Sequence, residues 1–107
     1  MRTYDLYGIQ GEDLATAKAK VGQALDLEFV AHESGYHCGL YFRHGDAGEE
    51  HFIIQSNFDS FEDEWTEPER RDKPFLLYVN ETLRSDELRR RLEAAGDIEL
   101  LRHQEIR

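Results

Sequence analysis

Two segments of this chain, residues 12–25 and 85–95, repeat their apolar side chains every three or four positions. That spacing places the apolar side chains along one side of an α-helix. The repeating residues are Leu14, Ala17, Val21 and Leu25 in the first segment and Leu88, Leu92 and Ala95 in the second. Helices that are apolar on one side only must cover an apolar surface, and one face of a β-sheet provides it. The pattern therefore favours a fold in which two helices pack against a sheet.

The second helical segment also has recognisable ends. Ser85 is a good N-cap residue, and Asp86 and Glu87 after it suit the positive end of the helix dipole. Gly96 is well placed to end the helix, because glycine adopts the backbone conformations found at helix C-termini. We therefore expect a helix with Ser85 as its N-cap and Gly96 as its stop.

Six further stretches are predicted to form strands, because they alternate apolar and polar residues or are rich in apolar ones. They are residues 3–9, 27–33, 36–43, 51–58, 74–80 and 98–106, with a turn at Ser34-Gly35. Phe52 and Ile54 are expected to face the core. The continuous apolar run from Phe75 to Val79 is typical of a central strand that is covered on both faces.

The predicted order of elements is β-α-β-β-β-loop-β-α-β within a single domain, residues 1–107. Consecutive strands joined by short connections favour antiparallel pairing. The order indicates an α+β fold: a two-layer sandwich with a mainly antiparallel sheet of five to six strands and both helices on one face. A variant of the ferredoxin-like, split β-α-β arrangement accounts best for it.

The net charge of the chain, −10, is concentrated in its middle. Residues 26–58 and 59–72 each carry a net charge of −5, whereas the segments before and after them hold equal numbers of acidic and basic residues. Binding to nucleic-acid phosphates depends on clustered Lys and Arg. The only cluster of arginines, residues 84–91, is interleaved with acidic residues, as on a solvated helix face. We therefore expect no nucleic-acid partner.

Cysteine content and hydropathy bear on where the protein acts. Cys38 is the only cysteine, so the chain has no internal disulfide, which fits a reducing compartment. No stretch approaches the roughly 20 apolar residues that span a bilayer. Residues 1–14 have no apolar run that could act as a signal sequence. The sequence predicts a cytoplasmic protein without a membrane partner.

Residues 59–72, here called the acidic loop, combine dense negative charge with large aromatic side chains and are predicted to be mostly irregular. Such a loop suits a basic partner protein, because charge steers association and aromatic side chains anchor it. The alternative is a solvated loop whose aromatic side chains fold back onto the core, as Phe61 or Trp65 is expected to do. The predicted partner-binding residues are Asp59, Phe61, Glu62, Asp63, Glu64, Trp65, Glu67 and Glu69.

No pattern typical of a catalytic, cofactor-binding or metal site stands out. The segment His44–His51 gathers two histidines and three carboxylates, but its spacing matches no familiar metal site and its glycines favour a hairpin turn. Cys38 follows His37 on a predicted strand, where neighbouring side chains point to opposite faces, so the two are not expected to form an activated thiolate pair. We therefore expect a protein that is not an enzyme, with no cofactor and no bound metal.

Several short motifs resemble those of a widespread group of small acidic bacterial proteins. The motifs are YDLYG at residues 4–8, AHESGY at 31–36, EHFIIQSN at 50–57, the pair Glu67-Pro68, and LLYVN at 76–80. That group resembles the immunity proteins of contact-dependent inhibition and other polymorphic toxin systems. The resemblance implies a protein that binds one cognate toxin domain, often a basic nuclease, and neutralises it by occluding the active site. It transfers no site residue, because immunity families differ in the surface they use.

Two other interpretations remain open. A small ligand-binding or enzymatic α+β domain would hold its ligand between sheet and loop, near His32, His37 or Tyr41. A homodimer would use the open face of the sheet or an edge strand, and the sequence is compatible with a monomer or a weak homodimer. Fold class alone does not decide between these functions, because one architecture hosts many activities.

Overall fold

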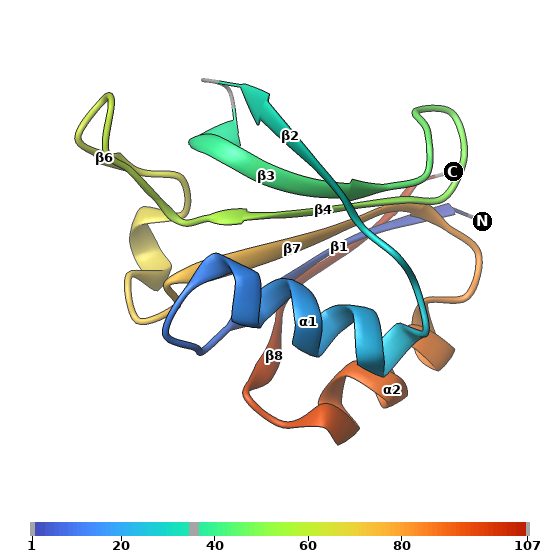
Figure 1. Ribbon diagram of the computed structural model, residues 1–107. Coiled ribbons are helices and arrows are strands. Elements are labelled where there is room, and N and C mark those ends of the chain that lie inside the picture. The colour runs from blue at the N-terminus through green and yellow to red at the C-terminus, as the bar shows by residue number, and fades with distance from the viewer. Residues whose placement is uncertain (1, 35–36, 107) are drawn as a thin grey trace.

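The structure, a computed structural model, describes residues 2–34 and 37–106 (Figure 1). Its helices are α1 (Leu14–Leu25) and α2 (Ser85–Ala95), and a short 3₁₀ turn, η2, spans Pro68–Arg70. Its strands are β1 (Arg2–Ile9), β2 (Val30–Ser34), β3 (Gly39–His44), β4 (His51–Ser56), β5 (Phe58–Asp59), β6 (Glu64–Trp65), β7 (Phe75–Thr82) and β8 (Ile98–Ile106). The predicted order of the main elements is confirmed, and β5 and β6 are additions within the acidic loop.

Six of these strands form one antiparallel sheet with the order β2-β3-β4-β7-β1-β8. Strands β1 and β4 are both antiparallel to β7, which lies between them, so they run in the same direction. Together with β8 on the far side of β1, this is the split β-α-β arrangement of the ferredoxin-like fold. Strands β2 and β3 extend that sheet on one side. Both helices lie on one face of it (Figure 1), as the sequence predicts for an α+β two-layer sandwich.

The core lies between the helices and the sheet. Phe52 and Ile54 face it and are buried, as predicted. Leu76 and Leu77 point to opposite faces of β7, yet both are fully buried. The prediction of a central strand is confirmed, and β7 is covered on both faces at this point, whereas Tyr78 is only partly buried on the face opposite the helices. Ala95 is exposed, contrary to its place in the predicted apolar stripe. Within residues 2–34 and 37–106, neither helix is long and apolar enough to cross a lipid bilayer.

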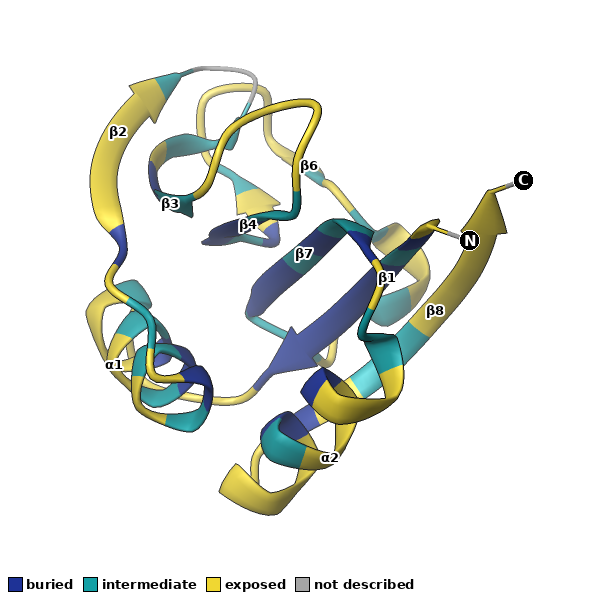
Figure 2. Cartoon of the chain, turned by 90° about the vertical axis from the view of Figure 1, so that its right-hand side faces the viewer, coloured by how far each residue is buried: buried dark blue, intermediate teal, exposed yellow. Residues whose placement is uncertain are grey.

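The predicted strand at residues 27–33 is shorter in the structure. Strand β2 begins only at Val30, lies at the edge of the sheet and is exposed along almost its whole length (Figure 2). Phe29 precedes the strand and is buried in the core, whereas Ala31 is exposed, contrary to the alternation read from the sequence. Gly35 and Tyr36, which belong to the next predicted turn and strand, lie outside the described residues.

The predicted N-cap of α2 is wrong by one residue. Arg84 occupies the cap position without a side-chain capping bond, and Ser85 is the first residue of the helix. The Ser85 hydroxyl instead donates a hydrogen bond to Asp5 in β1, at 2.6 Å. The sequence could not reveal this, because the acceptor lies 80 residues away. Gly96 is the C-cap of α2, as predicted.

Asp5 is a buried carboxylate that joins three elements. Its side chain is only 1% exposed, and beside Ser85 of α2 it contacts His103 of β8, with 2.5 Å between Asp5 Oδ1 and His103 Nδ1. Because the carboxylate favours the protonated imidazole, Asp5 raises the pKa of His103, and Glu105 adds to the effect. An ion pair thus ties the edge strand β8 to β1 at the margin of the core, and the hydrogen bond from Ser85 ties α2 to the same carboxylate.

We expect the free energy of unfolding to depend on this pair between neutral and alkaline pH. Because the pKa of His103 is raised in the folded protein, its contribution is fully present below the pKa of an unfolded histidine, about 6.5, and is lost as the pH rises through the folded value. Urea unfolding at a series of pH values measures this loss. The variant His103→Gln should show a smaller decrease across the same range, and an identical decrease in both proteins would contradict the role of the pair.

Tyr7 is completely buried, and its hydroxyl has no hydrogen-bond partner among the described residues. Burial raises the pKa of the phenol, so the group stays neutral. Removing an unsatisfied buried hydroxyl while keeping the ring should raise the free energy of unfolding, by about 1 kcal/mol. Urea unfolding of Tyr7→Phe tests this. Tyr4→Phe, which alters a partly exposed tyrosine, is the control and should change little; a destabilised Tyr7→Phe would show that the hydroxyl is satisfied in solution.

Candidate functional site

The acidic loop connects β4 to β7 and projects from one end of the sheet (Figure 1). Most of it is turn and bend, as predicted, but its first half contains a short hairpin that the sequence does not predict. Strands β5 and β6 pair as a small antiparallel hairpin, with Phe58 opposite Trp65 and Asp59 opposite Glu64. The 3₁₀ turn η2 follows in the second half. The loop therefore has a defined backbone shape despite its polar composition.

The turn of this hairpin is closed by one of the predicted binding residues. Asp59 Oδ1 accepts hydrogen bonds from the backbone amides of Phe61 and Glu62, at 2.9 and 3.3 Å. This is the local bonding by which Asp side chains commonly stabilise turns. Asp63 adopts the left-handed conformation, with φ +55°, which Asp tolerates better than most residues. Asp59 thus shapes the tip and is only partly available to a partner.

Asn57, immediately before the loop, holds its second half in place. This residue is completely buried. Its side-chain amide donates to the carbonyl oxygens of Arg70 and Lys73, each at 2.9 Å, and its side-chain oxygen accepts from the backbone amide of Glu67 at 2.8 Å. A single neutral side chain therefore satisfies backbone groups at two points of the loop and at Lys73 just after it.

The backbone of Asn57 closes the same loop at its base. Its amide donates to the carbonyl of Pro74 at 2.9 Å, next to the start of β7. Its carbonyl accepts from the amide of Thr66 at 2.7 Å, just after β6. Side chain and backbone together fix both halves of the acidic loop to the end of β4. The loop is consequently a preorganised structure.

The two aromatic residues of the loop have different environments. Trp65 is half-buried, packs edge to face on Phe58 with 5.2 Å between ring centroids, and has Arg71 over its ring at 6.0 Å. It is the more buried of the two, but its ring packs on Phe58 of the same hairpin and is not part of the core cluster, so the predicted fold-back onto the core is not seen. Phe61 is 76% exposed, and its ring lies against Gly39, where a Cβ would come within 3.1 Å of the ring. Phe61 is the aromatic side chain that the loop presents to solvent.

Apart from Asp59, which closes the turn, the carboxylates of the loop fall into two groups. Glu67 pairs with Arg102 at 2.9 Å, and Asp72 pairs with Arg70, which lowers the pKa of that carboxyl. The second group is exposed and forms no ion pair with any described residue. Its members are Glu62, Asp63, Glu64 and Glu69. Arginines near the base of the loop thus form ion pairs within the protein, whereas the carboxylates at the tip have no cationic partner among the described residues.

The segment His44–His51 does not gather its side chains around a common point. The ring of His44 contacts the carbonyl of Glu28 at 2.7 Å, whereas Glu50 pairs with Arg84 at 2.7 Å. That guanidinium lowers the pKa of Glu50. Among residues 2–34 and 37–106, no three or more His, Cys, Asp or Glu side chains are placed to hold a metal ion.

The side chains of His37 and Cys38 do not point to opposite faces of a strand, as the sequence predicts, but contact the same residue. Both precede β3, and Cys38 has a left-handed backbone, with φ +64°, so the strand alternation does not apply. Both side chains contact the amide of Gln55, His37 Nδ1 at 3.1 Å and Cys38 Sγ at 3.6 Å. Cys38 Sγ also lies 3.2 Å from the hydroxyl of Thr66 in the acidic loop. These contacts join the middle of the acidic loop and the end of β4 to the residues just before β3.

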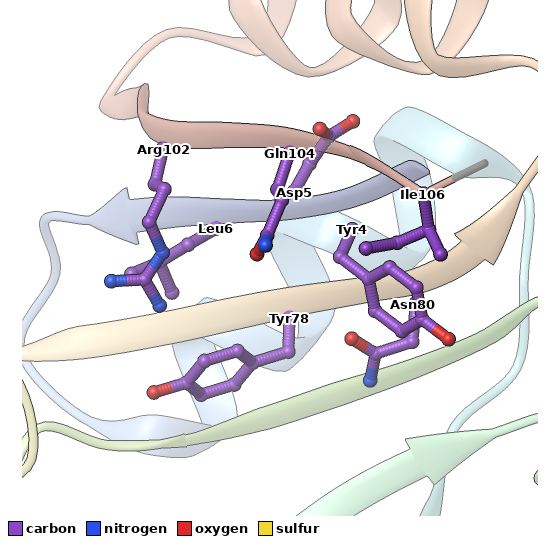
Figure 3. A pocket seen from close by; sticks show the side chains of 8 residues that line it. All are labelled: Tyr4, Asp5, Leu6, Tyr78, Asn80, Arg102, Gln104 and Ile106. Atoms are coloured by element: carbon purple, nitrogen blue, oxygen red, sulfur yellow. The ribbon is translucent and has the colours of Figure 1, made fainter. Parts of the chain in front are cut away.

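The face of the sheet opposite the helices contains a shallow groove that sequence reasoning missed. One depression of about 360 Å³ is lined by Tyr4, Asp5, Leu6, Tyr78, Asn80, Arg102, Gln104 and Ile106 (Figure 3). Tyr78 and Asn80 are two positions apart on β7, and so are Arg102 and Gln104 on β8. This period of two was visible in the sequence. The pairing of β1, β7 and β8, which brings the residues together, was not.

Comparison with known proteins provides no identification. The sequence matches no family model, no curated protein and no solved structure. Function must therefore be inferred from the chain's own residues. Two features are available for this: the acidic, aromatic tip on its rigid base, and the polar groove on the open face of the sheet.

Asn57→Ala should disrupt the loop, because several buried backbone groups then lose their partners. We expect a loss of about 2 kcal/mol or more in the free energy of unfolding, together with faster hydrogen exchange at the amides of Thr66 and Glu67. Urea unfolding and hydrogen-exchange mass spectrometry measure these effects. Asn80→Ala, which removes a partly exposed amide with one hydrogen bond, is the matched control. Equal destabilisation by the two substitutions would contradict the role given to Asn57.

Proposed function

We propose that this protein is an immunity protein that binds a basic toxin domain through the acidic loop and neutralises it by covering its active site. The observation that carries this proposal is the tip of the loop. There, Glu62, Asp63 and Glu64 have no internal ion partner, and the exposed ring of Phe61 lies beside them. A basic toxin of the nuclease type, whose active site uses Lys and Arg to hold phosphates, offers the complementary surface.

The charge and the aromatic ring have different roles in such a complex. A net charge of −10, with three adjacent unpaired carboxylates at the tip, attracts a basic partner over several ångströms and accelerates association. Burial of Phe61 in the interface removes an apolar ring from water and slows dissociation. Charge thus governs how fast the complex forms, and the ring governs how long it persists.

The rigid base of the loop supports tight binding. A flexible acidic segment would lose conformational entropy when it binds, which weakens affinity. Here Asn57 has already fixed the backbone, so little ordering remains to be done on binding. We infer a binding protein rather than an enzyme, one that acts in the cytoplasm as a monomer or weak homodimer until it meets its partner.

Capture of a partner by the tagged protein tests this proposal. The bait is incubated with the product of the neighbouring gene and, separately, with an extract of the source cells, at low and at moderate salt. We expect a basic protein to be recovered, and its affinity to fall as salt screens the charges. Recovery of no basic protein from either preparation would contradict the proposal.

Neutralising the tip should weaken capture without altering the fold. The variant Glu62→Gln/Asp63→Asn/Glu64→Gln removes three negative charges, and we expect it to slow association about tenfold or more. The control Glu12→Gln/Glu28→Gln/Asp86→Asn removes the same number of exposed charges elsewhere and should bind nearly as well as the unmodified protein. Stopped-flow or surface plasmon resonance with the captured protein measures both rates. Equal association rates for the two variants would exclude steering by the tip.

Removing the exposed ring should change a different rate. Phe61→Ala is expected to accelerate dissociation about tenfold or more, with little change in association. Because Phe61 is mostly exposed, its truncation should leave thermal stability unchanged. Trp65→Ala should also accelerate dissociation, but it removes the packing on Phe58 as well, so Phe61→Ala gives the clearer result. Unchanged dissociation of Phe61→Ala would remove this ring from the interface.

A further inference from the structure

The groove on the open face of the sheet presents polar groups that the protein itself does not use. Neither the hydroxyl of Tyr4 nor the side-chain amide of Gln104 forms a hydrogen bond with any described residue. Asn80 uses only its NH₂ group, which contacts His51, and leaves its oxygen free. Figure 3 shows these groups around one depression, while the carboxylate of Asp5 turns away from them. Uncharged amides and phenols that converge in a concavity are suited to hydrogen-bonding a ligand.

This depression is the middle of a longer strip. It shares Tyr78 and Asn80 with a second depression of about 440 Å³, which continues across β4 to Gln55 and Thr66. It shares Leu6 and Arg102 with a third depression, of about 430 Å³. The third is walled by residues 67–70 of the acidic loop. The three depressions therefore form one shallow surface across β4, β7, β1 and β8, which meets the acidic loop at Thr66 and again at residues 67–70. An open surface of this kind fits a peptide segment better than a compact small molecule.

The charges along the strip favour a basic occupant. Both of its arginines are neutralised: Arg102 pairs with Glu67, and Arg70 pairs with Asp72 and with Glu99, at 2.8 Å. Glu69 has no ion partner among the described residues and stands where the strip meets the acidic loop. The strip therefore adds no uncompensated positive charge to the surface and becomes acidic towards its end at the loop.

We propose that this groove binds an extended, arginine-containing segment of the partner protein. The free groups of Tyr4, Asn80 and Gln104 hydrogen-bond the backbone of that segment, which has no partner of its own in an extended conformation. A guanidinium group stacks on the ring of Tyr4. The basic character of the occupant rests on the proposed function; the groove adds a second contact surface, continuous with the acidic loop, and specifies an extended peptide.

A peptide titration of the whole protein tests the groove directly. The probe is a ten-residue peptide of alternating arginine and threonine with blocked ends, added to ¹⁵N-labelled protein. We expect backbone chemical-shift changes at Tyr4, Tyr78, Asn80 and Gln104. The same peptide with glutamate in place of arginine should produce none. Absence of shifts with the arginine peptide, or shifts confined to residues 59–72, would overturn the proposal.

Two matched variants locate the peptide on one face of the sheet. Gln104→Arg places a positive charge inside the groove and should lower the affinity for the arginine peptide about tenfold. Gln23→Arg makes the same change on the exposed surface of α1, on the other face, and should bind the peptide normally. Equal affinities of the two variants would overturn the groove as the binding site.

A third variant separates the groove from the proposed function. Glu62→Gln/Asp63→Asn/Glu64→Gln should keep the peptide-induced shifts in the groove while it loses capture of the basic protein. Failure of the groove is therefore distinguishable from failure of the proposed function.

Discussion

The acidic loop depends on one buried amide, the side chain of Asn57. The carboxylates that this loop carries repel one another, so the loop's own charges oppose a compact shape. Asn57 supplies hydrogen bonds to backbone groups at Glu67, Arg70 and Lys73 without adding a charge of its own. Aspartate at this position could accept hydrogen bonds but could not donate to the two carbonyl groups. A neutral donor and acceptor in one side chain is what lets so acidic a segment keep a single conformation.

Much of the fold could be predicted because it follows from periodicity. The apolar spacing of residues 14–25 and 85–95 requires two helices on one surface, and the run from Phe75 to Val79 identifies the strand at the centre of the sheet. Strands β5 and β6 could not be predicted, since two-residue strands have no period. Their hairpin is closed by hydrogen bonds from the amide of Phe61 to Asp59 and from the amide of Thr66 to the carbonyl of Asn57. Contacts such as Ser85 with Asp5 depend on residues that meet only after folding.

For the candidate site, the sequence predicts the negative charge of the loop but not which carboxylates are paired within the protein. Composition alone marks residues 59–72 as acidic and aromatic. It does not reveal that Glu67 is occupied by Arg102, 35 residues further along the chain, or that Asp59 closes the turn. The groove on the open face could not be predicted either, because it also depends on contacts between distant parts of the chain. Its residues come from strands that are distant in sequence, and only the strand order β7-β1-β8 sets them side by side.

The exposed edge of strand β2 makes the negative charge of the chain relevant to self-association. Within the described residues β2 pairs only with β3, so its outer edge presents backbone groups that another strand could join. Val30 on this strand is 61% exposed, and an exposed apolar side chain on an edge strand favours such pairing. Residues 26–58, which contain β2, carry a net charge of −5. Mutual repulsion between copies at this edge opposes sheet-to-sheet aggregation, so the acidity of this segment has a physical role that requires no partner at all.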